Sequence, residues 1–380
     1  MAPVCRFCGA PLTRTFIDLG ETPLANAYLP PEEVDQPEPR YPLHARVCDS
    51  CKLVQVESVV PPEAIFGHYA YFSSYSSSWI EHGRRFTESA AERFGLGGTS
   101  RVVEVASNDG YLLKHFVERG IPVLGVEPAR NVAEVAITKG VPTEMRFFGL
   151  ETARDLKAEG YSADLLVGNN VLAHVPDLND FVAGLAYLLK PDGVLSMEFP
   201  HLLKLIEEVQ FDTIYHEHFC YFSLLVVERV FARHGLRVFD VETLPTHGGS
   251  LRVMACRGES HVHPQGEGLA RVRAAEAAAG MGGDVLYAGF DAKVRALKAS
   301  LLAFLAKAKA EGKSVVAYGA AAKGNTLLNY CGVGEGDIAS VVDLNPHKQG
   351  HYLPGSHLPI LPPTRVFETR PDYLLILPWN

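Results

Sequence analysis

The segment "YHEHFCYF", residues 215–222, places two histidines, a glutamate and a tyrosine in four consecutive positions. It is not H-E-x-x-H, the motif that sets two histidines one helical turn apart to hold zinc. In an extended segment, alternation places Tyr215 and Glu217 on one side and His216 and His218 on the other. Three interpretations stay open: a metal site, an acid–base group, or buried histidines that only find hydrogen-bond partners.

Four of the seven cysteines form two C-x-x-C pairs, Cys5/Cys8 in "CRFCG" and Cys48/Cys51 in "CDSCK". Four thiolates at this spacing suit one tetrahedral zinc ion. A redox pair is the alternative, but two similar knuckles separated by a proline-rich stretch favour a structural metal. A closed four-sulfur site has no open position for a substrate, so its predicted role is to fold a segment too short for its own core. The module is therefore expected to be scaffold.

Short apolar runs alternate with amphipathic stretches from about Arg101, as in "RVVEVAS", "PVLGVEP" and "ADLLVGNNVL". Such alternation is typical of a parallel sheet covered on both faces, so it predicts a doubly wound, Rossmann-like α/β domain. Helical sequence from Leu269 to Ala310 leads to "KSVVAYGA" and "IASVVDLNP", which predict a second, C-terminal α/β unit.

The turn in "VVEVASNDG" lies between a predicted strand and a predicted helix, where open α/β sheets bind nucleotides. Ala106 and Asn108 replace the first two glycines of G-x-G-x-x-G, which disfavours a nicotinamide dinucleotide. S-adenosylmethionine has no phosphate, and its positive sulfonium and amino groups suit Glu104 and Asp109. Glu127, at the end of "VLGVEP", is expected to accept both ribose hydroxyls. The alternative is a turn with no ligand. The expected cofactor-binding residues are Glu104, Ala106, Asn108, Asp109, Gly110, Glu127, Pro128, Asn169 and Asn170.

A second candidate site lies in "AYGAAAKGNTLLN", residues 317–329. Its small residues allow close backbone approach, Lys323 supplies a positive charge, and a helix N-terminus supplies amide hydrogens. Together these features predict a diphosphate cradle, and the polar "VVDLNPHKQG" after the next strand is expected to contact a ribose or base. A structural lobe without a ligand is the alternative.

Length and charge limit the classes of protein. With 380 residues, 47% of them apolar, the chain is long enough for several cores. We expect a zinc-binding domain at 1–70, a cofactor domain at 71–258 and an α/β domain at 259–380. The net charge of −9 argues against a nucleic-acid partner. The sequence has no leader pattern and no apolar run of ~18 residues, so we expect a cytoplasmic protein with no membrane partner.

Several rare strings follow one another along the chain: "YFSSYSSSW" (71–79), "EVASNDGYLL", "NNVLAHVPDLNDFV", "YHEHFCYFS", "THGGSLR" (246–252), "YGAAAKGNTLLNY" and "DLNPHKQG". With the cysteine pairs they give a nearly end-to-end resemblance to the cytoplasmic sugar C-methyltransferases. These include C-3′-methyltransferases of nucleotide-linked 4-keto deoxysugars in antibiotic sugar pathways. The sequence departs from that family at Ala106, where glycine is common, and at "LPWN", past which the family usually continues.

The resemblance implies a zinc domain, a central S-adenosylmethionine domain and a C-terminal domain that helps to hold the nucleotide sugar, with dTDP as the expected nucleotide and a monomer as the expected state. It also implies that Tyr215, Glu217 and His218 face the sugar. Methylating a carbon beside a ketone requires a base and a group that stabilises the enolate oxygen. His218 is the predicted base, because histidine titrates near neutral pH. His216 is expected to point away.

Other residues are assigned to the same site. His174 and Tyr71 are expected to polarise the ketone, although Tyr69 and Tyr75 compete with Tyr71 as packing aromatics. The expected substrate-binding residues are Tyr75, His247, Arg252, Tyr318, Lys323, Gly324, Asn325, Thr326, Asp343 and Lys348.

Three other functions remain open from the sequence. They are an NAD-dependent oxidoreductase or epimerase of nucleotide sugars, a zinc-containing nucleic-acid methyltransferase, and a non-catalytic nucleotide-sugar binding protein. The missing G-x-G-x-x-G counts against the first and the acidic charge against the second.

Overall fold

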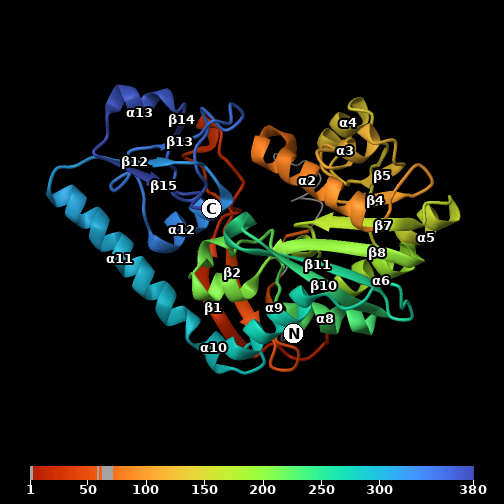
Figure 1. The fold of residues 1–380 in the computed structure, drawn as a ribbon. Helices are drawn as coiled ribbons and strands as arrows, with labels where there is room; N and C mark the ends of the chain where they lie inside the picture. Colours follow the sequence, from red (N-terminus) through yellow and green to blue (C-terminus); the bar gives the residue numbers. More distant parts are fainter. Residues whose placement is uncertain (1–2, 58–59, 62–71) are drawn as a thin grey trace.

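A central seven-stranded sheet dominates the computed structural model, which describes residues 3–57, 60–61 and 72–380 (Figure 1). Its strand order is β10-β11-β8-β7-β4-β5-β6. The strands are β4 (Val102–Val105), β5 (Val123–Val126), β6 (Thr143–Glu144), β7 (Ala163–Asn169), β8 (Leu189–Pro200), β10 (Leu236–Leu244) and β11 (Ser250–Arg257). Strand β4 runs parallel to β5 on one side and β7 on the other, so the chain reverses its winding direction there. The predicted doubly wound sheet is confirmed.

Helices cover the central sheet. All four residues of β4, "VVEV", are buried, as expected for a parallel strand covered on both faces. The antiparallel β10–β11 hairpin adds to the sheet beside β8. The helices of this region are α2 (Ser77–Arg93), α3 (Leu113–Glu118), α4 (Arg130–Thr138), α5 (Leu150–Ala158), α6 (Leu178–Leu188), α7 (Leu202–Glu207) and α8 (Leu224–Arg233).

The cysteine-rich N-terminal segment forms its own antiparallel sheet. Its order is β1-β2-β3-β9, with β1 (Arg14–Thr22), β2 (Tyr41–Val47), β3 (Val54–Val56) and β9 (Cys220–Tyr221). The last strand, β9, follows "YHEH" directly in the sequence. Pairing between β3 and β9 therefore attaches the "YHEH" segment to the N-terminal module.

The C-terminal region forms a second parallel α/β unit, as the sequence predicts. Helices α9 (Glu267–Ala279), α10 (Val285–Ala288) and α11 (Phe290–Ala310) lead to it, and α11 runs along one flank of the molecule (Figure 1). Its sheet has the order β14-β13-β12-β15, and all three pairings are parallel. Its elements are β12 (Val315–Tyr318), α12 (Ala322–Cys331), β13 (Val341–Val342), β14 (Ile360–Leu361), α13 (Thr364–Thr369) and β15 (Tyr373–Ile376).

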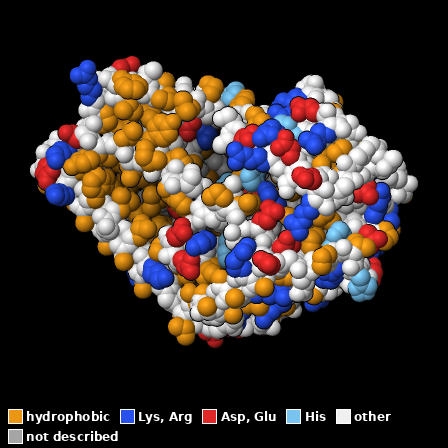
Figure 2. Space-filling model, in the orientation of Figure 1, with side chains coloured by type: hydrophobic (Ala, Val, Ile, Leu, Met, Phe, Trp, Pro, Cys, Tyr) orange, Lys and Arg blue, Asp and Glu red, His pale blue; other side chains and the backbone are white. Residues whose placement is uncertain are grey.

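Apolar side chains gather on the outer surface of this unit and along α11 (Figure 2). The exposed large apolar residues of these elements include Phe304 on α11, Phe367 on α13, and Leu374 and Ile376 on β15. None of the described helices combines the length and the apolar character needed to cross a lipid bilayer.

Candidate active site

A cavity of about 1280 Å³ lies where the three parts of the chain meet. Its walls include the carboxyl ends of β4, β5 and β7 and three residues of the "YHEH" segment. Residues 24 and 26–28 of the N-terminal module and residues 321–323, 343–346 and 348 of the C-terminal unit complete them. Ligands of open α/β sheets bind beyond the carboxyl ends of strands at the point where the strand order reverses. The cavity occupies that position.

One side of the cavity is built around the turn after β4. Ala106 and Asn108 have left-handed backbones, with φ of 54° and 51°, and both line the cavity. Glu127, at the end of β5, accepts hydrogen bonds from the backbone N–H groups of Asn108 at 3.0 Å and Ala129 at 2.9 Å. Burial raises the pKa of Glu127, and these two donors oppose the rise. The glutamate therefore fixes the turn while facing the cavity, as a ribose acceptor must.

Further residues complete this side of the cavity. Pro128, Asn169 and Asn170 line it as expected. Phe147 and Phe148, which follow β6 in the sequence, add aromatic side chains to the cavity lining, and such rings suit a flat base. Sequence reasoning missed this pair, although "RFFG" directly after a short strand next to β5 was an available signal.

Three predicted cofactor residues do not line the cavity. The Asp109 carboxylate pairs with Lys139 Nζ at 3.0 Å and with the Ser74 hydroxyl. Glu104 is buried within β4, and burial raises its pKa well above the usual value, which favours its neutral form. At Gly110, a Cβ would meet the Val141 side chain at 3.0 Å, so this glycine serves packing. The proposed contacts of Glu104 and Asp109 with the sulfonium are therefore not supported by their positions.

The "YHEH" segment is a turn, so the alternation of an extended segment does not apply to it. The backbone N–H of His218 bonds the carbonyl of Tyr215 at 2.9 Å. This closure brings Tyr215, Glu217 and His218 to the cavity together. His216 lies outside the lining, with Nε2 3.3 Å from the Pro42 carbonyl. Alternation would have put both histidines on one side, whereas the turn separates them.

The hydrogen bonds of His218 define which ring nitrogen carries the proton. Nδ1 lies 2.8 Å from the Thr213 carbonyl, which only accepts, so Nδ1 donates. In a neutral ring Nε2 then has a lone pair, and it accepts the hydroxyl of Tyr215 at 3.0 Å. Burial lowers the pKa of His218 well below its usual value, and His174 adds to this effect. The imidazole is therefore neutral near pH 7 and has a basic nitrogen at the cavity.

His174 lies next to this pair. Its ring centroid is 4.8 Å from that of His218, and its Nδ1 donates to the Glu217 carbonyl at 2.8 Å. Burial lowers the pKa of His174 to about 4, so it too is neutral. Tyr71, the other residue expected to polarise the ketone, lies outside the described residues, as does Tyr69.

The predicted substrate residues divide into two groups. Those that line the cavity are Tyr75, His247, Lys323, Asp343 and Lys348. Those outside the lining are Arg252, Tyr318, Gly324, Asn325 and Thr326.

Three residues of the second group make contacts that hold the fold. Arg252 is buried and pairs with Glu198 and Glu242, at 2.9 Å each. Asn325 Nδ2 donates to the Ala25 carbonyl, and a Cβ on Gly324 would meet Leu377. The motif "THGGSLR" therefore supplies His247 to the cavity, and "AAAKGNT" supplies Ala321, Ala322 and Lys323, while Arg252, Gly324 and Asn325 hold the fold.

The N-terminal module also contributes to the cavity, so its prediction as scaffold alone is wrong. Leu24, Asn26, Ala27 and Tyr28 follow β1 and line the wall opposite the central sheet. No local sequence signal marks this segment, because its contacts are with residues far along the chain.

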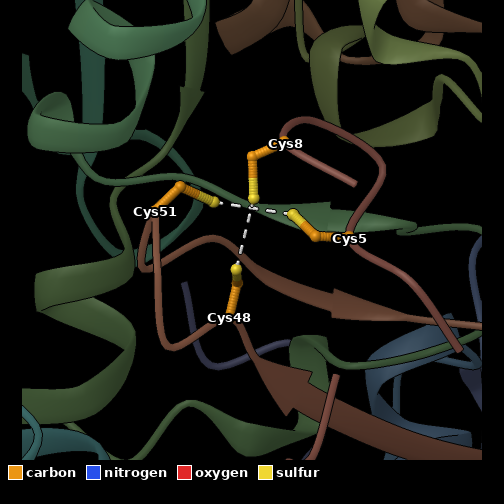
Figure 3. A group of neighbouring side chains, drawn as sticks. All are labelled: Cys5, Cys8, Cys48 and Cys51. Atoms are coloured by element: carbon orange, nitrogen blue, oxygen red, sulfur yellow. Dashed lines mark hydrogen bonds between the residues drawn. The ribbon is translucent and has the colours of Figure 1, made fainter. Parts of the chain in front are cut away.

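The four N-terminal cysteines point toward a common centre (Figure 3). Their sulfurs all lie within 4.8 Å of one another, with Cys5 to Cys51 and Cys8 to Cys48 at 3.5 Å each. Four thiolates with Zn–S bonds of about 2.3 Å have sulfurs this close together, so the donor set fits one tetrahedral zinc. The cluster is the zinc-binding site of the chain and is separate from the cavity.

We expect one zinc per chain, and Cys48→Ser to lose the metal and lower the thermal unfolding temperature. Zinc binding contributes folding free energy directly, so removing one of the four thiolates weakens both zinc binding and the stability of the fold. Plasma mass spectrometry measures the zinc, and Cys331→Ala, at a buried cysteine outside the cluster, is the control. Full zinc occupancy with unchanged unfolding in Cys48→Ser would contradict the assignment.

A doubly wound sheet with a cavity at its reversal point, and an acidic residue at the end of the second strand, are features of the methyltransferase class. Residues 79–241 match the family model "Methyltransferase domain". Residues 5–66 match "Putative zinc binding domain", and residues 245–380 match "C-methyltransferase C-terminal domain".

The curated "C-methyltransferase NovU" of Streptomyces niveus is 38% identical over 376 residues, covering 99% of this chain and 89% of that protein. The chain therefore belongs to the C-methyltransferase family. An "Ubiquinone biosynthesis O-methyltransferase" of Bartonella bacilliformis is 26% identical over 96 residues, 25% of this chain and 39% of that protein. Among solved structures, magnesium protoporphyrin IX methyltransferase from Synechocystis with bound SAH has 16% identity and a TM-score of 0.38, over 47% of this chain and 83% of that one.

Proposed function

We propose that this C-methyltransferase methylates a nucleotide-linked 4-keto deoxysugar at the carbon beside the ketone, with C3′ as the site and dTDP as the nucleotide. The observation that most supports this proposal is the Tyr215–His218 pair. A neutral histidine and a phenol lie 3.0 Å apart in the cavity that all three parts of the chain line. Bound S-adenosylmethionine supplies an electrophilic methyl group. The resemblance to sugar C-methyltransferases of antibiotic deoxysugar pathways supports the sugar and the nucleotide.

In this proposal Glu127 and the aromatic wall hold the cofactor. The two Glu127 oxygens already accept one backbone N–H each, and a carboxylate oxygen has a second lone pair for a ribose hydroxyl. Phe147 and Phe148 then cover the base. A cofactor held by these residues would share the cavity with the side chains of the "YHEH" turn.

His218 removes the proton from the carbon beside the ketone. Its Nε2 lone pair takes the proton, while the Thr213 carbonyl accepts from Nδ1 and stabilises the imidazolium that forms. The hydroxyl of Tyr215 must then turn its own hydrogen to another acceptor. The enolate oxygen is the acceptor that deprotonation creates, so Tyr215 is placed to stabilise it. The carbon–hydrogen electron pair enters the enolate, whose carbon would bond the methyl group of bound S-adenosylmethionine. The methyl–sulfur electron pair would stay on sulfur, which leaves as S-adenosylhomocysteine.

The positive side chains on the C-terminal wall are proposed to hold the diphosphate. Lys323 and Lys348 both line the cavity, and burial lowers the pKa of each. A diphosphate stabilises their charged forms because oppositely charged groups pair strongly in a partly buried site. Asp343, which accepts from the backbone N–H of Ala320 at 2.7 Å, orients the adjoining loop.

Lys323→Ala is expected to raise the apparent KM for the sugar nucleotide about tenfold or more and to leave the affinity for S-adenosylmethionine unchanged. The reason is the loss of a charge-assisted contact with the diphosphate alone. Steady-state kinetics and calorimetry measure the two quantities, with the exposed Lys307→Ala as the control. A loss of affinity for S-adenosylmethionine instead would mean that the C-terminal wall holds the cofactor and that the wall at the central sheet holds the nucleotide sugar.

The proposed reaction is tested by incubating the zinc-loaded protein with S-adenosylmethionine and a panel of nucleotide sugars with and without a 4-keto group. We expect a mass gain of one methylene only for keto sugars, and faster turnover with dTDP than with other nucleotides. Turnover of sugars without the ketone would refute the enolate route. Turnover that requires a nicotinamide cofactor would support an oxidoreductase.

A further inference from the structure

A segment of the zinc module reaches into the active-site cavity and donates a hydrogen bond to Glu217, one of the acidic residues there. Asn26 follows β1, and its Nδ2 donates to Oε1 of Glu217 at 2.7 Å across 191 positions of sequence. Both side chains line the cavity. This hydrogen bond joins the zinc module to the "YHEH" turn through side chains, beside the backbone pairing of β3 with β9.

The contacts of its neighbours hold Asn26 in place. The hydroxyl of Tyr28 lies 3.2 Å from Asn26 Oδ1 and 2.7 Å from the Ala320 carbonyl of the C-terminal unit. The Ala25 carbonyl accepts from Asn325 Nδ2 at 2.5 Å. The Glu217 carboxylate only accepts hydrogen bonds, so the amide presents its N–H₂ group to Glu217 and its oxygen to the Tyr28 hydroxyl. The C-terminal unit therefore holds this segment in place, and the Asn26 side chain contacts Glu217 of the "YHEH" turn.

We propose that Asn26 is a positioning residue for Glu217, so that the zinc module sets the direction and the charge of the active-site carboxylate. The proposal rests on the proposed function, in which Glu217 orients the sugar. It gives the module a role in the reaction beyond folding, since all three parts of the chain must assemble before this carboxylate is held.

Because Glu217 is buried, its hydrogen bond with Asn26 affects how much of the carboxyl group is ionised. The residue is buried, and burial raises the pKa of Glu217 to about 7, while the Asn26 hydrogen bond opposes the rise. A donor to a carboxylate favours the charged form, so Asn26 keeps more of Glu217 ionised near neutral pH. The other titratable side chains that line this cavity are Tyr28, Tyr75, Tyr111, Glu127, His174, Asp177, Asp180, Tyr215, His218, His247, Lys323, Asp343 and Lys348.

The direct test measures the protonation of Glu217 without turnover. Infrared difference spectra between the zinc-loaded wild type and Glu217→Gln isolate the carboxylic acid band, which is followed from pH 5 to pH 9. Asn26→Leu, compared with its own Glu217→Gln double variant, is expected to shift the midpoint upward by about one pH unit, because the carboxylate loses a donor. An unchanged midpoint would overturn the proposal.

The kinetic test uses the same four proteins. A rise in pKa from about 7 to about 8 lowers the ionised fraction at pH 7 from about one half to about one tenth. We therefore expect kcat of Asn26→Leu to fall roughly fivefold at pH 7 and to recover at higher pH, with both KM values within about threefold. In the Glu217→Gln background, Asn26→Leu should change kcat little. An equal loss in that background would assign Asn26 a role independent of Glu217.

Folding is checked separately, because Asn26 lies at a junction of three parts. Zinc content and circular dichroism of Asn26→Leu should match the wild type. If this variant does not fold, Asn26→Ser replaces it, since a serine is too short to reach the carboxylate but remains polar. If no sugar is methylated by the wild type, the proposed function fails while the infrared titration still decides the Asn26–Glu217 contact.

Discussion

Replacing His218 by asparagine is expected to lower kcat of methyl transfer by ~10²–10⁴-fold, the usual contribution of a general base. Asparagine keeps a donor for the Thr213 carbonyl but has no basic nitrogen beside Tyr215. The binding constants for both substrates should change little, because the lost interaction belongs to the transition state. Stopped-assay kinetics at saturating substrates measure the effect.

His216→Asn is the matched control for this experiment. The two histidines are separated by one residue, but His216 contacts the Pro42 carbonyl outside the cavity. A second readout follows deuterium uptake at the carbon beside the ketone in heavy water, with S-adenosylhomocysteine in place of the cofactor. Wild type and His216→Asn should exchange, and His218→Asn should not. Equal exchange in His218→Asn would transfer the role of base to Tyr215 or His174.

Glu127→Ala is expected to weaken S-adenosylmethionine binding by about 10- to 100-fold. A hydrogen bond to a charged group contributes ~1.5–3 kcal/mol, and each 1.4 kcal/mol is tenfold in affinity. Isothermal calorimetry measures the binding constant. Glu134→Ala, on the exposed face of α4, serves as the control, since its carboxylate pairs with Arg130 on the surface.

The Glu127 oxygens hold the turn after β4 as well as being proposed to bind the ribose. A cofactor analogue separates these two roles. The analogue is S-adenosylhomocysteine without its ribose hydroxyls. If Glu127 bonds the ribose, Glu127→Ala should weaken binding of S-adenosylhomocysteine much more than binding of this analogue. An equal loss for both ligands would mean that Glu127 only shapes the turn.

Much of the fold was predictable because local patterns dictate it. A parallel strand buried on both faces needs an unbroken apolar run, and "VVEV" provides one for β4. The paired C-x-x-C knuckles likewise fix a four-sulfur site whatever lies between them. The chain's two α/β units and its zinc-binding site follow from such short-range signals. The pairing of β3 with β9 does not, since it joins residues more than 160 positions apart.

The site was predictable only where a residue acts through its own chemical type and strand position. Glu127 at a strand end and Lys323 at a helix start are of this kind. The "YHEH" segment was misread because a turn, closed by the bond from His218 to Tyr215, replaced the alternation of a strand. Arg252 was misassigned because a buried partner, Glu198, neutralises it. Asn26 was missed because only tertiary contacts bring it to Glu217.

The position of the new methyl group tests the central claim most directly. The zinc-loaded enzyme is incubated with a dTDP-4-keto deoxysugar and S-adenosylmethionine carrying a ¹³C-labelled methyl group, and the product is analysed by two-dimensional NMR. The account predicts that the labelled methyl protons correlate with the ketone carbon and with the sugar carbon beside it, which places the methyl group on that carbon. A label attached to a sugar oxygen, or on a carbon not adjacent to the ketone, would contradict the account.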